Sequence, residues 1–280
     1  MYITNNSDVA KIAQSAGVDR IWVDMEFIGK DVRQRGLDTV KSRHTVDDVR
    51  RLRKVVSSSE LMVRINPIHE KSDEWPGTEA EIESVIDAGA DVIMLPYFKT
   101  ADEVKRFVDA VGCRTKTMIL VETKEALEAI HEILQVPGVD EVHVGLNDLH
   151  LSYGKDFMFE LLVDGTLDIL CNAFKAHDVV FGFGGIARVG YGMLPAELII
   201  AEHYQRGSSL AILSRGFCDA NSVEDPEEIR GLFLEGVRNI RLREQEVQRF
   251  SSDDFKSNHQ MIVEKVHSIV EQIRQKRGQE

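Results

Sequence analysis

Acidic side chains follow several short apolar segments of the chain, at the points where those segments end. Asp24 and Glu26 close one segment, and Glu122 and Asp148 close two others. Carboxylates gathered at one site repel one another, and a bound cation removes that repulsion. Two carboxylates from separate strands, with positions left for water and substrate, are typical of a Mg²⁺ or Mn²⁺ site, whereas zinc would need clustered His or Cys. Each acid taken singly has an alternative role as the N-cap of the helix that follows it.

The apolar segments themselves predict eight β-strands. Most are continuous apolar runs, as expected for parallel strands that are covered by helices. They are Tyr2–Thr4, Arg20–Glu26, Leu61–Asn66, Asp91–Pro96, Thr117–Glu122, Glu141–Leu146, Val179–Gly184 and Leu210–Ser214. The segments of helical period between them are Ser7–Ala16, Val46–Val56, Glu79–Ala88, Ala101–Val111, Lys124–Leu134, Asp168–Ala176 and Ala196–Gln205. Eight β–α units predict a closed (β/α)8 barrel, in which functional residues lie at the C-terminal ends of the strands.

Candidate anion-binding residues follow the last two predicted strands. Gly185 and Arg188 come after the seventh strand, and Ser214 and Arg215 after the eighth. These loops commonly bind phosphate in such barrels, because glycine lets backbone N–H groups approach an anion and arginine adds positive charge. We therefore expect a phosphate or carboxylate here. The alternative is that the glycines serve tight turns and the arginines pair with nearby acids such as Glu197.

A long basic connection, residues 28–44, follows the second predicted strand. It contains Lys30, Arg33, Arg35, Lys41, Arg43 and His44. A βα connection of this length is often a lid or a binding loop, and the alternative is a solvated surface loop. Together with the anion-binding residues, it suggests a substrate with a second anionic group, such as a phosphorylated or acidic sugar.

The composition argues against nucleic acid and membranes as partners. The chain has 280 residues and a net charge of −13, which repels phosphates and anionic lipid. No apolar run is long enough to span a bilayer, and the first residues lack the pattern of a signal peptide. Cys113, Cys171 and Cys218 show no pairing pattern. We therefore expect free thiols and a cytoplasmic location.

The C-terminal segment predicts a helix outside the barrel. A charged helix follows Gly236, residues 251–254 resemble a break with an N-cap, and an amphipathic helix covers Phe255–Arg277. Its apolar stripe consists of Met261, Ile262, Val266, Ile269, Val270 and Ile273. We divide the chain into a barrel of residues 1–250 and a C-terminal helix of residues 251–280. The stripe needs either its own barrel or a neighbouring subunit to pack against.

Several of these segments resemble the HpcH/HpaI aldolase–citrate lyase family. Residues 17–26 are similar to its first signature, and Leu61–Asn66 resembles the strand that carries its substrate arginine. Residues 87–96 match its next strand. Leu120–Thr123 resembles the strand that ends in its first metal-ligand glutamate, and residues 137–149 resemble the segment that ends in its metal-ligand aspartate. The order and spacing agree over residues 17–154.

The resemblance implies a metal-dependent enzyme that acts on 2-oxo acids such as pyruvate. Glu122 and Asp148 are then the expected ligands of Mg²⁺ or Mn²⁺. Arg64 would face the developing enolate oxygen and the carboxylate of the substrate, where a fixed cation is worth most. The alternative for Arg64 is a structural ion pair inside the mouth of the barrel. Members of this family are often oligomers in which the C-terminal helical part reaches another subunit. We therefore expect a homo-oligomer, with a hexamer as the expected form and the C-terminal helix in an interface.

The resemblance also implies supporting roles for other strand-end residues. Backbone amides near Gly145 and Asn147 would hold the substrate carboxylate. Asp24 and Glu26 would orient water that is bound to the metal and, with Arg64, belong to the predicted catalytic residues.

The chain departs from the family pattern at the residue expected to transfer protons. Phe27 stands where the family commonly has a histidine after its acidic signature, Leu146 replaces a proline, and His150 replaces a small residue. His44 at the end of the basic connection is a candidate substitute in space.

The first hypothesis is a metal-dependent aldolase that joins or cleaves a 2-oxo acid such as pyruvate and an aldehyde. The absence of the usual histidine leaves a second enzyme hypothesis open, a lyase acting on a coenzyme A thioester or on a phosphoenolpyruvate-type substrate. The third hypothesis is a catalytically silent barrel that binds or assembles, and the joint presence of Arg64, Glu122 and Asp148 argues against it.

Overall fold

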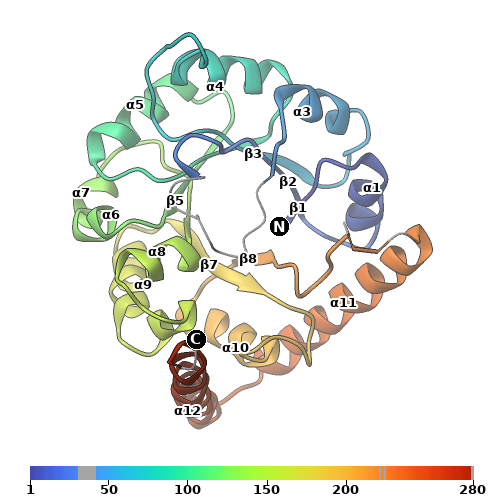
Figure 1. Cartoon of the computed structure of the whole chain (residues 1–280), viewed down its shortest axis with the longest axis vertical. Helices are drawn as coiled ribbons and strands as arrows, with labels where there is room; N and C mark the ends of the chain where they lie inside the picture. Colours follow the sequence, from blue (N-terminus) through green and yellow to red (C-terminus); the bar gives the residue numbers. More distant parts are fainter. Residues whose placement is uncertain (31–41, 221, 224, 279–280) are drawn as a thin grey trace.

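A computed structural model describes residues 1–30, 42–220, 222–223 and 225–278 of the chain (Figure 1). Within these residues, eight parallel strands form one sheet in sequence order. They are β1 (Tyr2–Ile3), β2 (Arg20–Asp24), β3 (Glu60–Arg64), β4 (Val92–Leu95), β5 (Lys116–Val121), β6 (Glu141–Val144), β7 (Val180–Ile186) and β8 (Leu210–Leu213). Every predicted strand overlaps one of them.

The sheet curves round until its first and last strands meet. β1 pairs with β2, and the backbone N–H of Leu213 in β8 donates to the carbonyl oxygen of Met1 at 2.8 Å. Figure 1 looks along the barrel, with the helices in a ring around the strands. The predicted (β/α)8 barrel is therefore confirmed.

The helices lie between and after the strands. They are α1 (Ser7–Ser15), α3 (Val46–Arg53), α4 (Thr78–Asp87), α5 (Ala101–Val111), α6 (Lys124–Glu128), α7 (Ile130–Ile133), α8 (Leu146–Ser152), the 3-10 helix η1 (Met158–Leu162), α9 (Thr166–Ala176), α10 (Ala196–Arg206), α11 (Pro226–Val247) and α12 (Ser252–Arg277).

Two predictions of element bounds need correction. α11 begins at Pro226, well before Gly236, because the side chain of Asp225 caps its first turn and proline suits that position. Leu146 belongs to α8, because β6 already ends at Val144.

Side chains fill the barrel interior near the N-terminal ends of the strands and leave space for a site at the C-terminal ends. Arg20 on β2 donates to Glu60 on β3 at 2.9 Å and to Glu141 on β6 at 2.6 Å, and these ion pairs form a layer near the N-terminal ends of the strands. An apolar layer follows, made by Met1, Trp22, Met62, Val92, Met94, Met118 and Leu120. The C-terminal strand ends above it are the usual place of function in such barrels.

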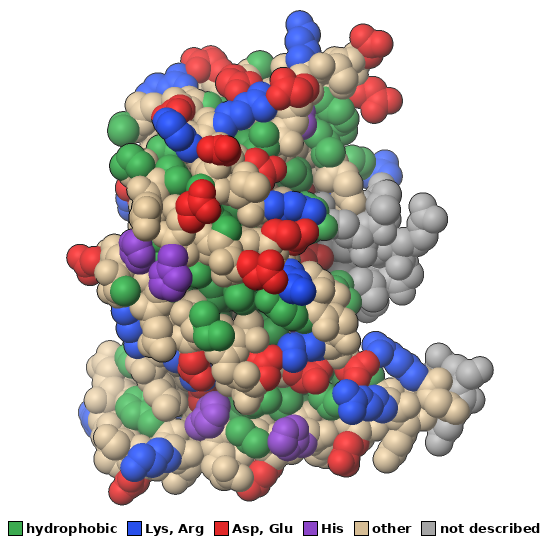
Figure 2. Space-filling model, turned by 90° about the vertical axis from the view of Figure 1, so that its left-hand side faces the viewer, with side chains coloured by type: hydrophobic (Ala, Val, Ile, Leu, Met, Phe, Trp, Pro, Cys, Tyr) green, Lys and Arg blue, Asp and Glu red, His purple; other side chains and the backbone are tan. Residues whose placement is uncertain are grey.

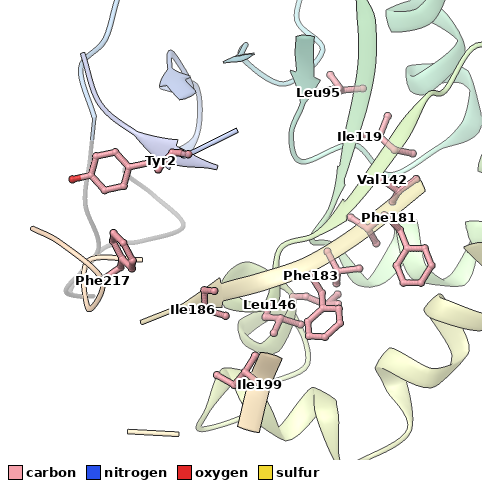
Figure 3. Close-up of a cluster of buried hydrophobic side chains, with 14 of the residues drawn as sticks. Tyr2, Leu95, Ile119, Val142, Leu146, Phe181, Phe183, Ile186, Ile199 and Phe217 are labelled. Atoms are coloured by element: carbon pink, nitrogen blue, oxygen red, sulfur yellow. The ribbon is translucent and has the colours of Figure 1, made fainter. Parts of the chain in front are cut away.

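The main core lies between the strands and the surrounding helices, and part of it fixes α8. Figure 3 shows Leu146, Ile186 and Ile199 together where α8, β7 and α10 meet. A Cβ atom at Gly184 would lie 2.7 Å from Cδ1 of Leu146, so a side chain there would push α8 away. This close packing sets the position of Asp148, which lies in the first turn of α8.

The C-terminal helix α12 packs on its own barrel. Four residues of its apolar stripe are buried, namely Ile262, Val266, Ile269 and Val270, and the helix lies beside α10 (Figure 1). Asn258 donates to the carbonyl oxygen of Leu198 at 3.1 Å, and Nδ1 of His259 lies 3.2 Å from the buried carboxylate of Glu202. The stripe therefore needs no neighbouring subunit to cover it, because α10 does so. The homo-oligomer stays a prediction, as does the division at residue 250.

We expect Val266→Asp on α12 to destabilise the fold strongly. Val266 is fully buried, so the substitution removes a packed side chain and places a carboxyl group in apolar surroundings. The free energy of unfolding should fall by about 3–5 kcal/mol. Met261 on the same helix is 45% exposed, and Met261→Asp should change that free energy by less than about 0.5 kcal/mol. Equal urea unfolding midpoints for the two variants would show that α12 is not docked in this way.

The outer surface carries charges of both signs. On the face shown in Figure 2, acidic and basic side chains are interspersed with small hydrophobic patches. Exposed ion pairs such as Lys105–Asp109 contribute little to stability, because water already solvates both partners. Among the described helices, none is both long and apolar enough to cross a membrane.

Candidate active site

A cavity of about 450 Å³ opens at the C-terminal ends of the strands. Most of the predicted site residues line it, namely Asp24, Arg64, Glu122, Gly145, Asn147, Asp148, Gly185, Ser214 and Arg215. Three others, Glu26, His44 and Arg188, are not among the described residues that line it. The barrel thus brings side chains from β2, β3, β5, α8 and the ends of β7 and β8 to one space.

Asp24 is the centre of a buried ion-pair network. Arg64 donates from Nε to Oδ1 of Asp24 and from Nη2 to Oδ2, both at 2.8 Å. Lys30 Nζ lies 2.8 Å from Asp24 Oδ2 and 3.5 Å from Glu26 Oε2. Burial raises the pKa of Asp24, but Arg64 and Lys30 outweigh it and hold that pKa well below its usual range. The Asp24 carboxylate is therefore ionised, and it fixes both cations at the cavity wall.

Contacts on several sides fix the guanidinium of Arg64. Its Nη1 lies 3.3 Å from Glu26 Oε2, and its Cζ lies 4.9 Å from the ring centroid of Trp22. Burial lowers the pKa of Arg64, but Asp24 and Glu26 outweigh it, so Arg64 stays protonated. Of the five N–H donors of a guanidinium, Asp24 takes two and Glu26 lies beside Nη1, so the remaining N–H groups are left for a ligand in the cavity. Trp22 and Lys30 also belong to the site, although the pattern of strand ends does not predict either of them. The clustering of basic residues after the second strand was the one available signal for Lys30.

Glu122 and Asp148 reach the cavity from neighbouring strands. Glu122 follows β5, and its Oε1 accepts a hydrogen bond from the backbone N–H of Tyr97 at 2.9 Å. A Cβ atom at Gly145 would lie 2.9 Å from Glu122 Oε2, so the position of this carboxylate requires glycine at 145. Asp148 lies in the first turn of α8 and lines the same cavity.

The balance of charges here suits a divalent cation. Four carboxylates meet two cations in this group, which gives a formal charge of −2 for Asp24, Glu26, Glu122, Asp148, Lys30 and Arg64. Mg²⁺ and Mn²⁺ prefer oxygen ligands and retain several waters. No cluster of three or more His, Cys, Asp or Glu in the described part of the chain could hold a metal. The carboxylates of Glu122 and Asp148 on the cavity wall fit an ion with two carboxylate ligands and open positions.

His44 and Arg188 have other surroundings. His44 Nδ1 accepts a hydrogen bond from the backbone N–H of Asp24 at 3.1 Å. His44 lines a neighbouring cavity of about 360 Å³. Burial lowers the pKa of His44, which favours the neutral ring that this hydrogen bond requires. Arg188 lies over the ring of Tyr191, 4.2 Å from its centroid. Three basic residues of the 28–44 connection lie outside the described residues, namely Arg33, Arg35 and Lys41.

The other expected anion-binding residues lie together where β7 and β8 end. The backbone N–H of Ser214 donates to the carbonyl oxygen of Ile186 at 2.9 Å. A Cβ atom at Gly185 would lie 3.5 Å from that of Ser214, and Arg215 is exposed at the rim. Gly185, Ser214 and Arg215 thus line the cavity while Arg188 does not.

Two histidines deeper in the fold are held neutral. His143 on β6 lines the cavity, is fully buried, and has its Nε2 3.1 Å from the carbonyl oxygen of Gly184. His203 on α10 stacks on Phe183 with ring centroids 3.8 Å apart, and its Nδ1 lies 2.7 Å from Ser208 Oγ. Burial lowers the pKa of each ring to about 3.

We expect the stability of the fold to decrease as the pH falls below about 6.5. The unfolded chain binds protons at these two rings near the ordinary histidine pKa, whereas the folded chain binds them only near pH 3. The stabilisation is therefore complete above the ordinary pKa and is lost as the pH falls from there toward the folded pKa. Each of the two histidines should lower the free energy of unfolding by about 1.4 kcal/mol per pH unit in that window.

Urea denaturation at several pH values measures this slope. His143→Phe keeps a ring of similar size that cannot titrate, so the dependence on pH should become shallower even if the variant is less stable overall. An unchanged slope would contradict a buried, neutral His143.

Comparison with known proteins gives relatives that cover part of the chain. A hydroxypyruvate/pyruvate aldolase of Sagittula stellata is 33% identical over a match that covers 26% of this chain and 41% of that protein. A 2-keto-3-deoxy-L-rhamnonate aldolase of Escherichia coli is 24% identical, and the match covers 54% of this chain and 60% of that protein. The chain thus spans less than two thirds of the length of either relative.

A solved structure and a family profile extend the comparison. The HpcH/HpaI aldolase of Desulfitobacterium hafniense has the same fold, with a TM-score of 0.56 at 19% identity, covering 86% of this chain and 91% of that one. The profile of the family described as HpcH/HpaI aldolase/citrate lyase matches residues 1–158. This match is more than half of the 280 residues and includes Arg64, Glu122 and Asp148. The chain belongs to the HpcH/HpaI aldolase/citrate lyase family.

Proposed function

We propose that the chain is a metal-dependent aldolase, a carbon–carbon lyase that joins or cleaves pyruvate, or a similar 2-oxo acid, and an aldehyde. The observation that carries this proposal is that Arg64, Glu122 and Asp148 line one cavity. An oxo-acid needs a fixed cation beside its carboxylate and enolate oxygens, and it needs a Lewis acid at its keto oxygen. Membership of the family supports the same chemistry.

The residues of the cavity have complementary roles in this proposal. Glu122 and Asp148 would hold Mg²⁺ or Mn²⁺, which supplies Lewis-acid polarisation of the keto oxygen when bound. Arg64 would bind the substrate carboxylate through the N–H groups that Asp24 leaves available. Negative charge grows on the oxo-acid portion as the carbon–carbon bond breaks. Because Asp24 and Trp22 already fix the guanidinium, Arg64 can stabilise that charge without moving.

Lys30 is better placed than His44 to transfer a proton to or from the substrate, because Lys30 lines the cavity and His44 does not. An aldolase must move a proton to or from the oxygen of the aldehyde portion. In the direction of bond formation, the ammonium of Lys30 would donate a proton to this oxygen, and the proton lost from the pyruvate methyl group would restore the ammonium. Asp24 and Glu26 hold that ammonium at the cavity. His44 lies behind Asp24 and bonds to its backbone. We therefore assign His44 a positioning role.

Residues at the rim of the cavity are suited to bind a second anionic group of the substrate. Gly185, Ser214 and Arg215 line the cavity where β7 and β8 end, and Arg215 is exposed there. A phosphate or carboxylate at the far end of the aldehyde, as in a phosphorylated or acidic sugar, would meet the arginine side chain at this position.

Assembly and location are also proposals. We propose a cytoplasmic homo-oligomer, with a hexamer as the expected form. The free cysteines Cys113, Cys171 and Cys218 support a reducing compartment. Light scattering on the intact chain tests the oligomer directly, and a monomer at micromolar concentration would contradict it.

Two reactions that require no aldehyde test the proposed function. The chain is treated with EDTA, and Mg²⁺ or Mn²⁺ is then restored. We expect metal-dependent decarboxylation of oxaloacetate and metal-dependent exchange of the pyruvate methyl protons for deuterium, followed by NMR. Loss of both reactions with metal restored would overturn the proposal in favour of a binding role. Exchange without aldol product from any aldehyde would favour the lyase on a coenzyme A thioester or a phosphoenolpyruvate-type substrate.

A further inference from the structure

The cavity has two chemically different sides. The charged groups of the oxo-acid site come from β2, β3, β5 and α8. Another part of the wall comes from η1 with the residue before it, Phe157, and from the connection between β7 and α10. The side chains from these segments are apolar, namely Phe157, Met158, Phe159, Met193 and Leu194. We call these five residues the apolar wall.

The apolar wall has a buried base and an exposed lip. Phe157 and Phe159 are buried and pack edge to face, with ring centroids 5.3 Å apart, and Leu194 is buried beside the cavity. Met193 is 64% exposed and lines the same cavity, so part of its side chain is available to a ligand. An unbranched thioether adapts its shape to a ligand, so Met193 can close on a hydrocarbon group.

The turn that presents Met193 is set by its own backbone. Gly190 and Gly192 have φ values of +84° and +98°, which favour glycine, and the N–H of Gly190 donates to Glu197 Oε2 at 3.0 Å. A Cβ atom at Gly192 would lie 2.8 Å from the carbonyl oxygen of Leu194. The turn therefore holds Met193 in a defined place at the cavity mouth.

We propose that the apolar wall binds the carbon chain of the aldehyde, so that the preferred aldehyde carries hydrocarbon groups next to its carbonyl rather than hydroxyl groups. The inference rests on the proposed aldolase function. A hydroxyl against these side chains loses its hydrogen bonds to water and finds no partner among them. Each CH₂ removed from water favours binding about fourfold. An anionic end group can still reach Arg215 at the rim. The inference therefore narrows the acidic or phosphorylated aldehydes of the proposed function to those with a hydrocarbon chain between the carbonyl and that end, and it excludes a sugar with hydroxyl groups there.

The first test compares aldehydes that are all uncharged. With pyruvate and Mg²⁺, kcat/KM should rise about fourfold per added CH₂ from acetaldehyde through propanal to butanal. Propanal should exceed glyceraldehyde, which has the same number of carbons, by about tenfold or more. A preference for glyceraldehyde while pyruvate exchange proceeds would overturn the inference and leave the proposed function intact. Absence of exchange would overturn the proposed function, and the inference with it.

The second test changes Met193, the exposed residue of the apolar wall. Met193→Asp should lower kcat/KM for butanal about tenfold more than for glyceraldehyde, because it replaces an apolar contact with a charge. Met261→Asp makes the same replacement at an exposed position on α12 and should leave the ratio between the two aldehydes unchanged. Equal losses for both aldehydes in Met193→Asp would overturn the inference. A change of oligomeric state with an unchanged ratio would overturn it too, and would assign Met193 to a subunit contact.

Discussion

Glu122→Gln is expected to lower kcat/KM of the metal-dependent reaction by roughly a thousandfold when the metal is below saturation, a loss of about 4 kcal/mol. The amide keeps the shape of the side chain and its oxygen can still accept from the N–H of Tyr97. It removes, however, one of the two negative charges that would hold the ion. Asp148→Asn should have the same effect for the same reason. Without metal, neither variant should be less stable than the wild type, because each relieves repulsion in a group of formal charge −2.

Thermal unfolding separates loss of metal binding from loss of fold. A ligand that binds only the folded chain raises the unfolding temperature as its concentration exceeds its dissociation constant, so Mn²⁺ should stabilise the wild type but not Glu122→Gln. Glu125→Gln, three residues along the chain on the exposed part of α6, is the matched control and should retain full activity and the full Mn²⁺ effect. Full activity of the wild type after exhaustive EDTA treatment would refute the metal site.

Much of the fold and of the charged side of the cavity follows from where the apolar runs end. A parallel barrel brings the C-terminal ends of all its strands to one face, so residues far apart in sequence can be placed together before any coordinates are known. Arg64 and Glu122 line the cavity for this reason, although β3 and β5 are not neighbours. The pattern does not reveal how such side chains pair. The bond of Asp24 to both Arg64 and Lys30 depends on distances that only the folded chain defines.

The apolar wall could not be predicted from the same pattern. Phe159 and Met193 lie outside the strands, and an apolar residue in a connection looks the same whether it faces the core, a ligand or a partner. Lys30 and His44 present a similar problem, since both belong to one basic connection and only their surroundings distinguish them. Burial and direction are properties of tertiary packing, which a periodicity in sequence does not contain.

The C-terminal helix illustrates a further limit. The stripe that includes Val266 correctly indicates that one face of α12 must be covered, but it does not identify the covering surface. That surface is α10, where the carbonyl of Leu198 and the carboxylate of Glu202 meet Asn258 and His259 of α12. Such polar contacts make the docking specific, and they join residues about sixty positions apart in the sequence.

Arg64→Lys is expected to reduce kcat/KM by about 30- to 1000-fold, equivalent to about 2–4 kcal/mol of transition-state stabilisation. Lysine keeps the positive charge and can still pair with Asp24. It cannot bind both oxygens of Asp24 with one edge and present further N–H groups to a substrate carboxylate with the other, and it loses the planar contact with Trp22. Arg106→Lys is the matched control, because Arg106 also binds a carboxylate through two nitrogens, at Glu79, but on the outer surface. If Arg64→Lys unfolds at the same temperature as Arg106→Lys and exchanges pyruvate protons within twofold of the wild-type rate, the guanidinium of Arg64 has no special part in the reaction and the prediction is wrong.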